Sequence, residues 1–250
     1  MMGASSHPIL RGGIIAAGEG RRLRADGYRA SKPMVRVAGR PLIEHAIDRF
    51  RAVGIRRLTI IINHDSDDCR QWLDRHGRDL ELDLIVRTTA SSYASFRLVA
   101  DRLAPEPAVI TTVDGIMPVE DFRAYVQAAA GFPETAVVLG VTSHVDDENP
   151  LWVTLDRADG RIRQLGGGDG SHVTAGLYRL PAERPPLPAE RPPLPGAEFP
   201  RLRDYLGWLV AERQPVYGVV VPGVFDIDRA RDITAAESAT PGHAHRADDA

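Results

Sequence analysis

Short apolar runs rich in β-branched residues alternate with helical patterns along most of this chain, and this alternation most limits the folds that it can adopt. Strands are predicted at residues 9–16, 58–62, 84–87, 109–113, 136–141, 151–155, 173–178 and 216–221. Helices are predicted at 41–53, 67–75, 92–103, 119–130 and 202–212. Strands that alternate with helices favour a mainly parallel sheet covered by helices on both faces. From residue 151 onward strands outnumber helices, so we expect a mixed α/β half to complete the sheet.

The composition is typical of one globular domain. The chain has 250 residues, of which 43% are hydrophobic and 26% charged, and this is enough for one sizeable core. Its formal net charge of −3 gives no global attraction for nucleic acid or for an anionic membrane, so we expect neither as a partner. We expect a single domain at 9–238, with a first half at 9–135 and a second half at 136–238.

Cysteine, histidine and the N-terminal residues argue against several further classes. Cys69 is the single cysteine, so no intramolecular disulfide can form and nothing indicates an oxidising compartment. The eight histidines are scattered without the spacing of a structural zinc site. The first residues lack the pattern of a signal peptide, and no apolar run approaches the ~20 residues that span a bilayer. We therefore expect a cytoplasmic protein, either a monomer or a homodimer.

A proline-rich segment interrupts the alternation at residues 180–200. The heptad LPAERPP occurs at 180–186 and again at 187–193. Proline at this density removes backbone donors and favours extended polyproline II, which predicts a surface loop. A ligand for a proline-binding domain is the alternative interpretation. The polar tail at 239–250 is predicted to be disordered.

The first predicted strand runs into the glycine-containing loop AAGEG at 16–20, and a cluster of cations follows it. Residues 21–40 contain one acidic residue, Asp26. Glycines at the end of a strand let backbone N–H groups approach an anion, and cations neutralise the charge that the amides bind. A polyphosphate is therefore the expected ligand. The seven cations are Arg21, Arg22, Arg24, Arg29, Lys32, Arg36 and Arg40.

Two common phosphate-binding motifs do not fit this loop. The dinucleotide motif needs a third glycine, but Gly20 is followed by Arg-Arg-Leu. The P-loop needs Gly-Lys-Ser/Thr, whereas the lysine here comes well after the glycines and in the reverse order Ser31-Lys32. Lys32 is the only lysine among the 31 Lys and Arg residues. Because Pro33 follows it and disfavours helix at the preceding residue, Lys32 is predicted to lie on extended chain.

Three features together resemble the sugar-phosphate nucleotidyltransferases, also called nucleoside-diphosphate-sugar pyrophosphorylases, and the wider group that includes the molybdenum-cofactor guanylyltransferases. They are the pattern GxGxRL at 18–23, the Lys-Pro pair at 32–33 and the segment VAGRPLIEHAID at 37–48. The resemblance covers residues 10–237. It implies a Rossmann-like, mainly parallel mixed sheet flanked by helices, the nucleotide-diphospho-sugar transferase or GT-A-like fold. It also implies that the first half binds nucleotide and the second half binds the acceptor.

The resemblance assigns roles to the glycine loop and to Lys32. In the family the loop wraps a nucleoside triphosphate, the arginine of GxGxRL meets its phosphates, and the lysine of Lys-Pro lies at the reacting phosphorus. Arg22 and Lys32 are therefore the expected catalytic residues. The expected nucleotide-binding residues of the loop are Ala16, Ala17, Gly18, Glu19, Gly20 and Arg21.

Two aspartates are expected to hold magnesium. Asp114 ends the apolar run at 107–114, which is predicted to contain a strand. Ligands of open α/β sheets bind outside the carboxyl ends of the strands. The position of Asp114 also matches that of the family's magnesium ligand. The segment VFDIDRARDI at 224–233 resembles the family's closing segment, in which an aspartate supplies the second carboxylate and a short helix follows. We assign Asp226 to it, with Asp228 as the alternative. Magnesium takes one or two carboxylates plus substrate phosphates and waters, whereas a turn or helix cap is the other explanation of each aspartate.

The base and the acceptor stay open. Thr88, Ser91 and Ser95 lie where the family binds the base, although Ser91 or Ser92 equally suits the cap of the following helix. The expected acceptor-binding residues are Gly140, Thr174 and Gly176. Many uridylyl and thymidylyl members carry asparagine at the position of Thr174. They also carry a Glu-Lys pair where this chain has the sequence RQLG at 163–166.

These residues predict a magnesium-dependent nucleotidyltransferase. An oxygen of the acceptor phosphate, most simply that of a sugar 1-phosphate, attacks the α-phosphorus of a nucleoside triphosphate, and pyrophosphate leaves. Positioning and charge stabilisation supply most of the catalysis. The alternatives are a cytidylyl or guanylyl transferase acting on a choline, inositol or cofactor phosphate, a nucleotide-binding protein without turnover, and a metal-dependent glycosyltransferase of similar architecture.

Overall fold

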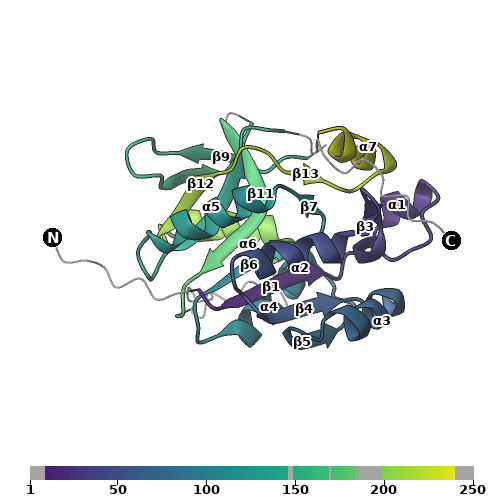
Figure 1. Ribbon diagram of the computed structural model, residues 1–250. Coiled ribbons are helices and arrows are strands. Elements are labelled where there is room, and N and C mark those ends of the chain that lie inside the picture. The colour runs from purple at the N-terminus through teal and green to yellow at the C-terminus, as the bar shows by residue number, and fades with distance from the viewer. Residues whose placement is uncertain (1–8, 146–148, 169, 184, 186–198, 240–250) are drawn as a thin grey trace.

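The computed structural model describes residues 9–145, 149–168, 170–183, 185 and 199–239. A nine-stranded mixed sheet runs through its centre, in the order β10-β9-β11-β6-β1-β4-β5, with β8 paired to β11 and β12 paired to β8 (Figure 1). The strands are β1 (Arg11–Ala16), β4 (Arg57–Ile62), β5 (Glu81–Val86), β6 (Ala108–Thr112), β8 (Val137–Thr142), β9 (Trp152–Leu155), β10 (Ile162–Leu165), β11 (His172–Leu180) and β12 (Val216–Val220).

Parallel and antiparallel pairs divide the sheet between the two halves of the chain. β1 pairs in parallel with both β4 and β6, and β4 pairs in parallel with β5. β11 runs antiparallel to β6, β8 and β9. The first half therefore forms the parallel part of the sheet, and β11 joins it to the mixed part.

Helices cover both faces, and each face has its own apolar core. Along β1 the side chains alternate, because Ile14 packs into one core and Ile15 lies against the other. Helices α2 (Leu42–Ala52), α3 (Asp67–His76), α5 (Val119–Ala130) and α7 (Ala230–Ala239) contribute to the first core. Helices α4 (Ser92–Leu103) and α6 (Leu202–Ala211) contribute to the second.

Short elements gather around the loop that follows β1. They are α1 (Arg21–Ala25), the 3-10 helix η1 (Lys32–Met34), and the strand pairs β2 (Arg36–Val37) with β3 (Arg40–Pro41) and β7 (Gly115–Ile116) with β13 (Phe225–Asp226). The antiparallel pair of β7 and β13 sets Asp226 opposite Gly115. This pairing brings the C-terminal segment to the end of β6.

The predicted fold class is confirmed, because the sheet is mainly parallel in its first half, mixed in its second, and flanked by helices. All eight predicted strands and five predicted helices occur, most of them with ends shifted by one to three residues. β5 begins at Glu81 rather than at residue 84, since polar residues alternate along this edge strand and mask its start. The sequence did not predict β10, α1 or the short strand pairs, which are too short for a periodic pattern.

Two predictions fall largely outside the described residues. The proline-rich loop at 180–200 includes residues 184 and 186–198, and the tail includes residues 240–250. Ala239, the first residue of the predicted tail, ends α7 instead. Among the helices that the structure describes, none has the length and apolarity needed to cross a bilayer.

Candidate active site

Charged and polar side chains from distant parts of the chain meet at the carboxyl ends of β1, β4 and β6. The glycine loop follows β1, Asn63 follows β4, and Asp114 lies just after β6. The β7–β13 pair adds Asp226 from the C-terminal segment. Ligands of open α/β sheets bind at this edge, so it is the candidate active site.

The glycine loop packs against the side chain of Lys32. Gly20 has a φ of 62° and caps the N-terminus of α1. A Cβ on Gly20 would lie 3.0 Å from the Lys32 Cβ, and a Cβ on Gly18 would lie 3.8 Å from the Lys32 Cδ. Asn63 Nδ2 donates to the carbonyls of Ala17 and Gly18 at 3.4 and 3.3 Å. Lys32 and Asn63 therefore fix the loop from two sides.

Lys32 lies in the middle of a cluster of aspartates, with 8% of its surface exposed. Its Nζ donates to Asp114 Oδ2 at 2.7 Å and to Asp228 Oδ1 at 2.5 Å. Burial lowers the pKa of Lys32, but Asp114, Asp226 and Asp228 raise this pKa by more, so it lies above its ordinary value. Lys32 therefore stays an ammonium at neutral pH and supplies positive charge, not a general base.

The backbone at Lys32 is a tight turn, and the prediction of extended chain there is wrong. Lys32 begins η1, and the Met34 N–H donates to the Ser31 carbonyl at 2.8 Å. The extended residue is Ser31, with φ −59° and ψ 152°. Asp68, in the first turn of α3, accepts hydrogen bonds from the Ser31 N–H and Oγ at 2.9 and 2.6 Å. These bonds hold Ser31 extended, and the turn starts one residue later.

Asp114 faces Lys32 as an ionised carboxylate. Burial raises the pKa of Asp114, but the charge and hydrogen bond of Lys32, with a further hydrogen bond from Thr112, lower this pKa by more. The net shift is downward. The Asp114 carbonyl also accepts a hydrogen bond from the Ile227 N–H at 3.1 Å, which ties the end of β6 to the segment that carries Asp226.

Arg49, on α2, supports the turn that presents Asp114. It is 1% exposed, and its Nη1 donates to the Gly115 carbonyl at 2.7 Å. Its Cζ lies 5.9 Å from the centre of the Phe122 ring. Within the described residues its Nε and Nη2 have no hydrogen-bond partner, and burial lowers the pKa of Arg49 to about 10, against the attraction of Asp114. A buried cation with so few partners lowers the stability of the folded protein. We infer that the role of Arg49 is to position the turn at Asp114 and Gly115.

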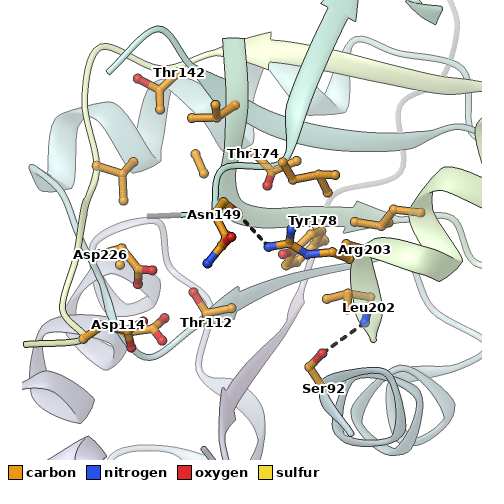
Figure 2. Close-up of a pocket in the computed structure, with 18 of the residues that line it drawn as sticks. Ser92, Thr112, Asp114, Thr142, Asn149, Thr174, Tyr178, Leu202, Arg203 and Asp226 are labelled. Atoms are coloured by element: carbon orange, nitrogen blue, oxygen red, sulfur yellow. Dashed lines mark hydrogen bonds between the residues drawn. The ribbon is translucent and has the colours of Figure 1, made fainter. Parts of the chain in front are cut away.

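Asp226 and Asp228, the two alternatives for the second metal carboxylate, both reach the site but make different contacts. Asp228 pairs with Lys32 and accepts from Arg22 Nη1 at 2.8 Å. Asp226 lines the cavity beside Asp114 (Figure 2). In the part of the chain that the structure describes, no group of three or more His, Cys, Asp or Glu side chains is arranged to hold a metal ion. Two carboxylates facing one cavity nevertheless suit magnesium, which takes its remaining ligands from phosphate and water.

A cavity of about 580 Å³ opens beside these aspartates and extends along β11. Thr174 and Gly176, both predicted for acceptor binding, line it. Gly176 has a φ of 67°, and a Cβ there would lie 2.5 Å from Thr112 Oγ1, so no other residue fits without movement. Away from the aspartates the wall is mixed, with apolar residues such as Leu151, Val173 and Leu206 beside polar ones. Its side chains include Thr142, His144, Asn149, Tyr178, Arg201 and Arg203.

Gly140, the third residue predicted for acceptor binding, packs against the neighbouring strand β11. It does not belong to the cavity wall. A Cβ on Gly140 would lie 2.8 Å from the Leu177 Cβ on the neighbouring strand β11. The glycine therefore allows the two strands to pack closely.

The residues predicted to read the base have structural partners. Ser91 Oγ accepts from the Ala94 N–H at 3.1 Å and caps α4, as the alternative interpretation expected. Ser95 is buried and its Oγ lies 2.6 Å from Thr89 Oγ1. Thr88 is exposed after β5 and accepts from the His64 N–H at 3.4 Å. Of the three predicted residues, Thr88 is the one exposed to solvent.

Glu19 and Arg21 lie at the rim of the glycine loop. They form an ion pair with each other, and both side chains are exposed. The hydrogen bond and charge of Arg21 lower the pKa of Glu19. Ala16 and Ala17 are buried at the end of β1, so these two residues can offer only backbone groups to a ligand.

Comparison with known proteins adds a sequence match to this geometry. The family model for the MobA-like NTP transferase domain matches residues 12–180. The chain belongs to this family. The matched part contains Lys32 and Asp114, whereas Asp226, Asp228 and Arg203 lie beyond it.

Proteins similar to this chain differ in the substrates that their names give. The chain is 24% identical over 238 residues to the probable mannose-1-phosphate guanylyltransferase 2 of Arabidopsis thaliana, covering 88% of this chain and 62% of the relative. It is 26% identical over 185 residues to a CMP-5'-(3-aminopropyl)phosphonate synthase of Streptomyces rubellomurinus, covering 68% of this chain and 28% of the relative. The chain thus spans less than two thirds of these relatives.

A solved structure shares the whole fold. The inositol-1-phosphate CTP transferase from T. maritima matches with a TM-score of 0.75 at 17% identity, covering 93% of this chain and 96% of the other. At this identity the match supports the fold rather than a substrate. It extends beyond residue 180, where the match to the family model ends.

Sequence reasoning missed several residues of the site in this family member. Asn63 follows a predicted strand directly, which is a usable signal. Arg49 sits on the apolar face of its helix, three residues after Ala46, where an arginine is unexpected. Asp68 and Arg203 carried no signal, because their roles depend on contacts with residues far away in sequence.

Proposed function

We propose that this protein transfers a nucleotidyl group from a nucleoside triphosphate to a phosphorylated acceptor, with a sugar 1-phosphate as the expected acceptor. An acceptor phosphate oxygen forms a bond to the α-phosphorus, the bond from that phosphorus to the α–β bridging oxygen breaks, and pyrophosphate leaves. The observation that carries the proposal is Lys32, a buried permanent cation between Asp114 and Asp228 and beside the glycine loop.

The first half of the chain supplies the triphosphate site. The glycine loop offers backbone groups at the end of β1, where a phosphate chain can approach closely. Arg22 lies at the start of α1 and would hold the β- and γ-phosphates, since its planar guanidinium suits phosphate oxygens. In the structure Arg22 pairs with Asp228, so triphosphate binding exchanges one anionic partner for another.

Lys32 acts on the α-phosphate. A compact ammonium on a flexible stem can follow a single oxygen as its charge grows, whereas an arginine fork is built for two. Because Lys32 is buried and held by aspartates, it is already oriented before substrate binds. Arg49 and Asn63 keep the aspartate turn and the glycine loop in place around it.

Asp114 and Asp226 would hold Mg²⁺, and the family's use of a divalent metal supports this assignment. Both carboxylates face the cavity, and magnesium accepts one or two carboxylates with phosphates and waters. When bound, the ion neutralises charge on the phosphates of the reacting substrate. A reaction that consumes a nucleoside triphosphate also supports the expected cytoplasmic location.

The acceptor is the less defined substrate. The guanylyltransferase relative is named for mannose 1-phosphate, the solved structure for inositol 1-phosphate, and a third relative for a phosphonate. A guanylyl or cytidylyl transferase acting on a non-sugar phosphate is therefore the second candidate. Both candidates share the site around Lys32 and differ at the far end of the cavity.

Pyrophosphate release tests the proposal. Each of the common nucleoside triphosphates is incubated with a set of sugar and non-sugar phosphates, with and without Mg²⁺. We expect one triphosphate and one acceptor class to release pyrophosphate, and only with the metal. Tight triphosphate binding without pyrophosphate release for any acceptor would instead indicate a nucleotide-binding protein without turnover.

A further inference from the structure

We propose that the acceptor carries a second negatively charged group, which Arg203 binds at the end of the cavity away from the aspartates. The expected substrate is a phosphorylated molecule with a further carboxylate or phosphate, rather than a sugar whose other groups are all hydroxyls. This inference rests on the proposed function and concerns the acceptor half of the same cavity.

The two ends of the cavity differ in charge. Asp114, Asp226 and Asp228 line one end. Arg203 projects into the cavity from the opposite side, as Figure 2 shows for Asp114, Asp226 and Arg203. On the proposed function the attacking phosphate lies near Lys32 and the aspartates, which leaves Arg203 to contact another part of the acceptor.

The guanidinium of Arg203 uses few of its hydrogen-bond donors within the described residues. Its Nη2 donates to the Asn149 carbonyl at 2.9 Å, drawn as a dashed line in Figure 2. Within the described residues this is the one hydrogen bond of its side chain, and no ion pair of Arg203 is found there. A guanidinium has five N–H donors in a fork that fits a carboxylate or phosphate. The remaining donors are available to an anion in the cavity.

The other two arginines of the cavity wall are matched by carboxylates. Arg22 pairs with Asp228 at 2.8 Å. Arg201 is exposed and pairs with Asp204 through two hydrogen bonds of 3.2 and 3.3 Å. Among the described lining residues, Arg203 is therefore the cation whose charge no carboxylate balances.

The surroundings of Arg203 suit an anion better than a set of hydroxyls. Each sugar hydroxyl has a proton to donate, and a carboxylate is a strong acceptor for it, whereas a guanidinium accepts none. The described wall at this end contains no carboxylate. Besides Arg201, its other polar side chains include Ser92, Thr142, His144, Asn149, Thr174 and Tyr178.

The backbone that carries Arg203 is firmly held. Its neighbour Leu202 is buried and donates its N–H to Ser92 Oγ at 3.0 Å (Figure 2). On the same helix, Tyr205 packs against Tyr93 and Phe199 with ring centroids 5.1 and 5.5 Å apart. A rigid support lowers the entropy cost of ligand binding, so Arg203 is prepared for an anion before the acceptor arrives.

Matched acceptors provide the test. With the triphosphate that the protein accepts, kcat/KM is measured for glucose 1-phosphate, glucuronic acid 1-phosphate and glucose 1,6-bisphosphate, and for glycerol 3-phosphate against 3-phosphoglycerate. We expect the best acceptor to carry the second anion and to exceed its neutral counterpart by at least about tenfold, equivalent to about 1.4 kcal/mol. A best acceptor without a second anion would overturn the inference and leave the proposed function intact. Absence of pyrophosphate release from every acceptor would instead overturn the proposed function.

The variant Arg203→Gln tests whether the side chain of Arg203 causes the preference for an acceptor with a second anion. We expect kcat/KM for the anionic acceptor to fall by at least about tenfold, and that for its neutral counterpart by less than about threefold. Arg203→Lys should restore part of the preference. Arg163→Gln is the control, because Arg163 is an exposed arginine of β10 that pairs with Asp156 outside the cavity. An equal loss for both acceptors would mean that Arg203 binds the shared phosphate, and would overturn the inference.

Discussion

The two halves of the chain contribute to one site in different ways. In the first half, the glycine loop, Asn63 and Asp114 each follow a parallel strand, and the topology alone brings them together. In the second half, the cavity wall combines the antiparallel strand β11 with the start of α6. Residues such as Arg203 lie at no strand end and in no local motif.

The charges of the two halves differ as well. Lys32 and Arg22 are paired with aspartates in the structure, and Asp114 pairs with Lys32. Arg203 has no such partner among the described residues. On the proposed function, the first half would carry out the transfer step and the second half would select the acceptor. Changes in the first half should therefore affect turnover with every acceptor.

The largest effect is expected for Lys32→Arg. The substitution keeps the charge but replaces a compact ammonium, buried between Asp114 and Asp228, by a larger planar group. We expect kcat to fall by about a hundred- to a thousandfold with every acceptor, while the triphosphate still raises the melting temperature. Arg36→Lys, which exchanges the same two residue types at an exposed position of the same cationic segment, is the control. Undiminished turnover of Lys32→Arg would remove the catalytic role.

The next effect separates the three aspartates. Asp114→Asn and Asp226→Asn are expected to lower turnover by about a hundredfold or more and to abolish the added thermal stability that Mg²⁺ gives with triphosphate, because they would remove the proposed metal ligands. Asp228→Asn should keep the magnesium effect and weaken triphosphate-free stability, because Asp228 pairs with Lys32 and Arg22. Asp74→Asn, an exposed aspartate of α3, is the control. The reverse pattern for Asp226 and Asp228 would exchange their roles.

Arg49→Met tests the support of the Asp114 turn. We expect turnover to fall by about tenfold, because the Gly115 carbonyl loses its hydrogen bond and the turn moves. The free energy of unfolding should change little, since methionine fills similar space without a poorly paired buried charge. Denaturant unfolding measured beside kcat distinguishes the two roles. A large loss of stability with normal kcat would show that Arg49 is structural alone.

The smallest effect concerns acid stability in the first half. Burial lowers the pKa of His45, whose Nε2 lies 2.9 Å from the Val37 carbonyl. Between its folded and unfolded pKa values, the folded protein binds fewer protons than the unfolded chain. The contribution of neutral His45 to the free energy of unfolding is therefore fully present above the unfolded pKa of about 6.5. This contribution is lost as the pH falls through the lower pKa of the folded protein. Urea midpoints of His45→Gln should fall less between pH 7.5 and pH 5 than those of the parent or of His64→Gln, and parallel curves would contradict this.

Much of the fold was predictable, because apolar periodicity fixed the long elements. Helices 92–103 and 119–130 occur with the predicted bounds. The elements that were missed are short or depend on distant partners, such as β13, which exists only through its pairing with β7. Extended chain at Lys32 was a reasonable prediction from Pro33 and failed because the hydrogen bonds of Asp68 hold the preceding residue extended instead.

The candidate site divides in the same way. Lys32, Arg22 and Asp114 lie in or near a local sequence pattern, and the structure brings all three together with Asp228. Gly140 was assigned to the acceptor because glycine often permits close approach of a ligand, but the group that approaches it is Leu177. Arg203 could not be predicted, because it acts through a carbonyl that is more than fifty residues away in sequence. Arg49 left one signal, its place on the apolar face of α2, but its contact with the Gly115 carbonyl could not be predicted.

The central claim is the transfer of a nucleotidyl group, and the fate of the α-phosphorus tests it most directly. The protein is incubated with a triphosphate labelled at the α-phosphorus, a panel of phosphorylated acceptors and Mg²⁺, and the products are separated. We predict that the label moves into a product joined to the acceptor, with an equal amount of unlabelled pyrophosphate, and that Lys32→Arg largely prevents this. Label that stays in the triphosphate, or appears only as free monophosphate, would contradict the claim.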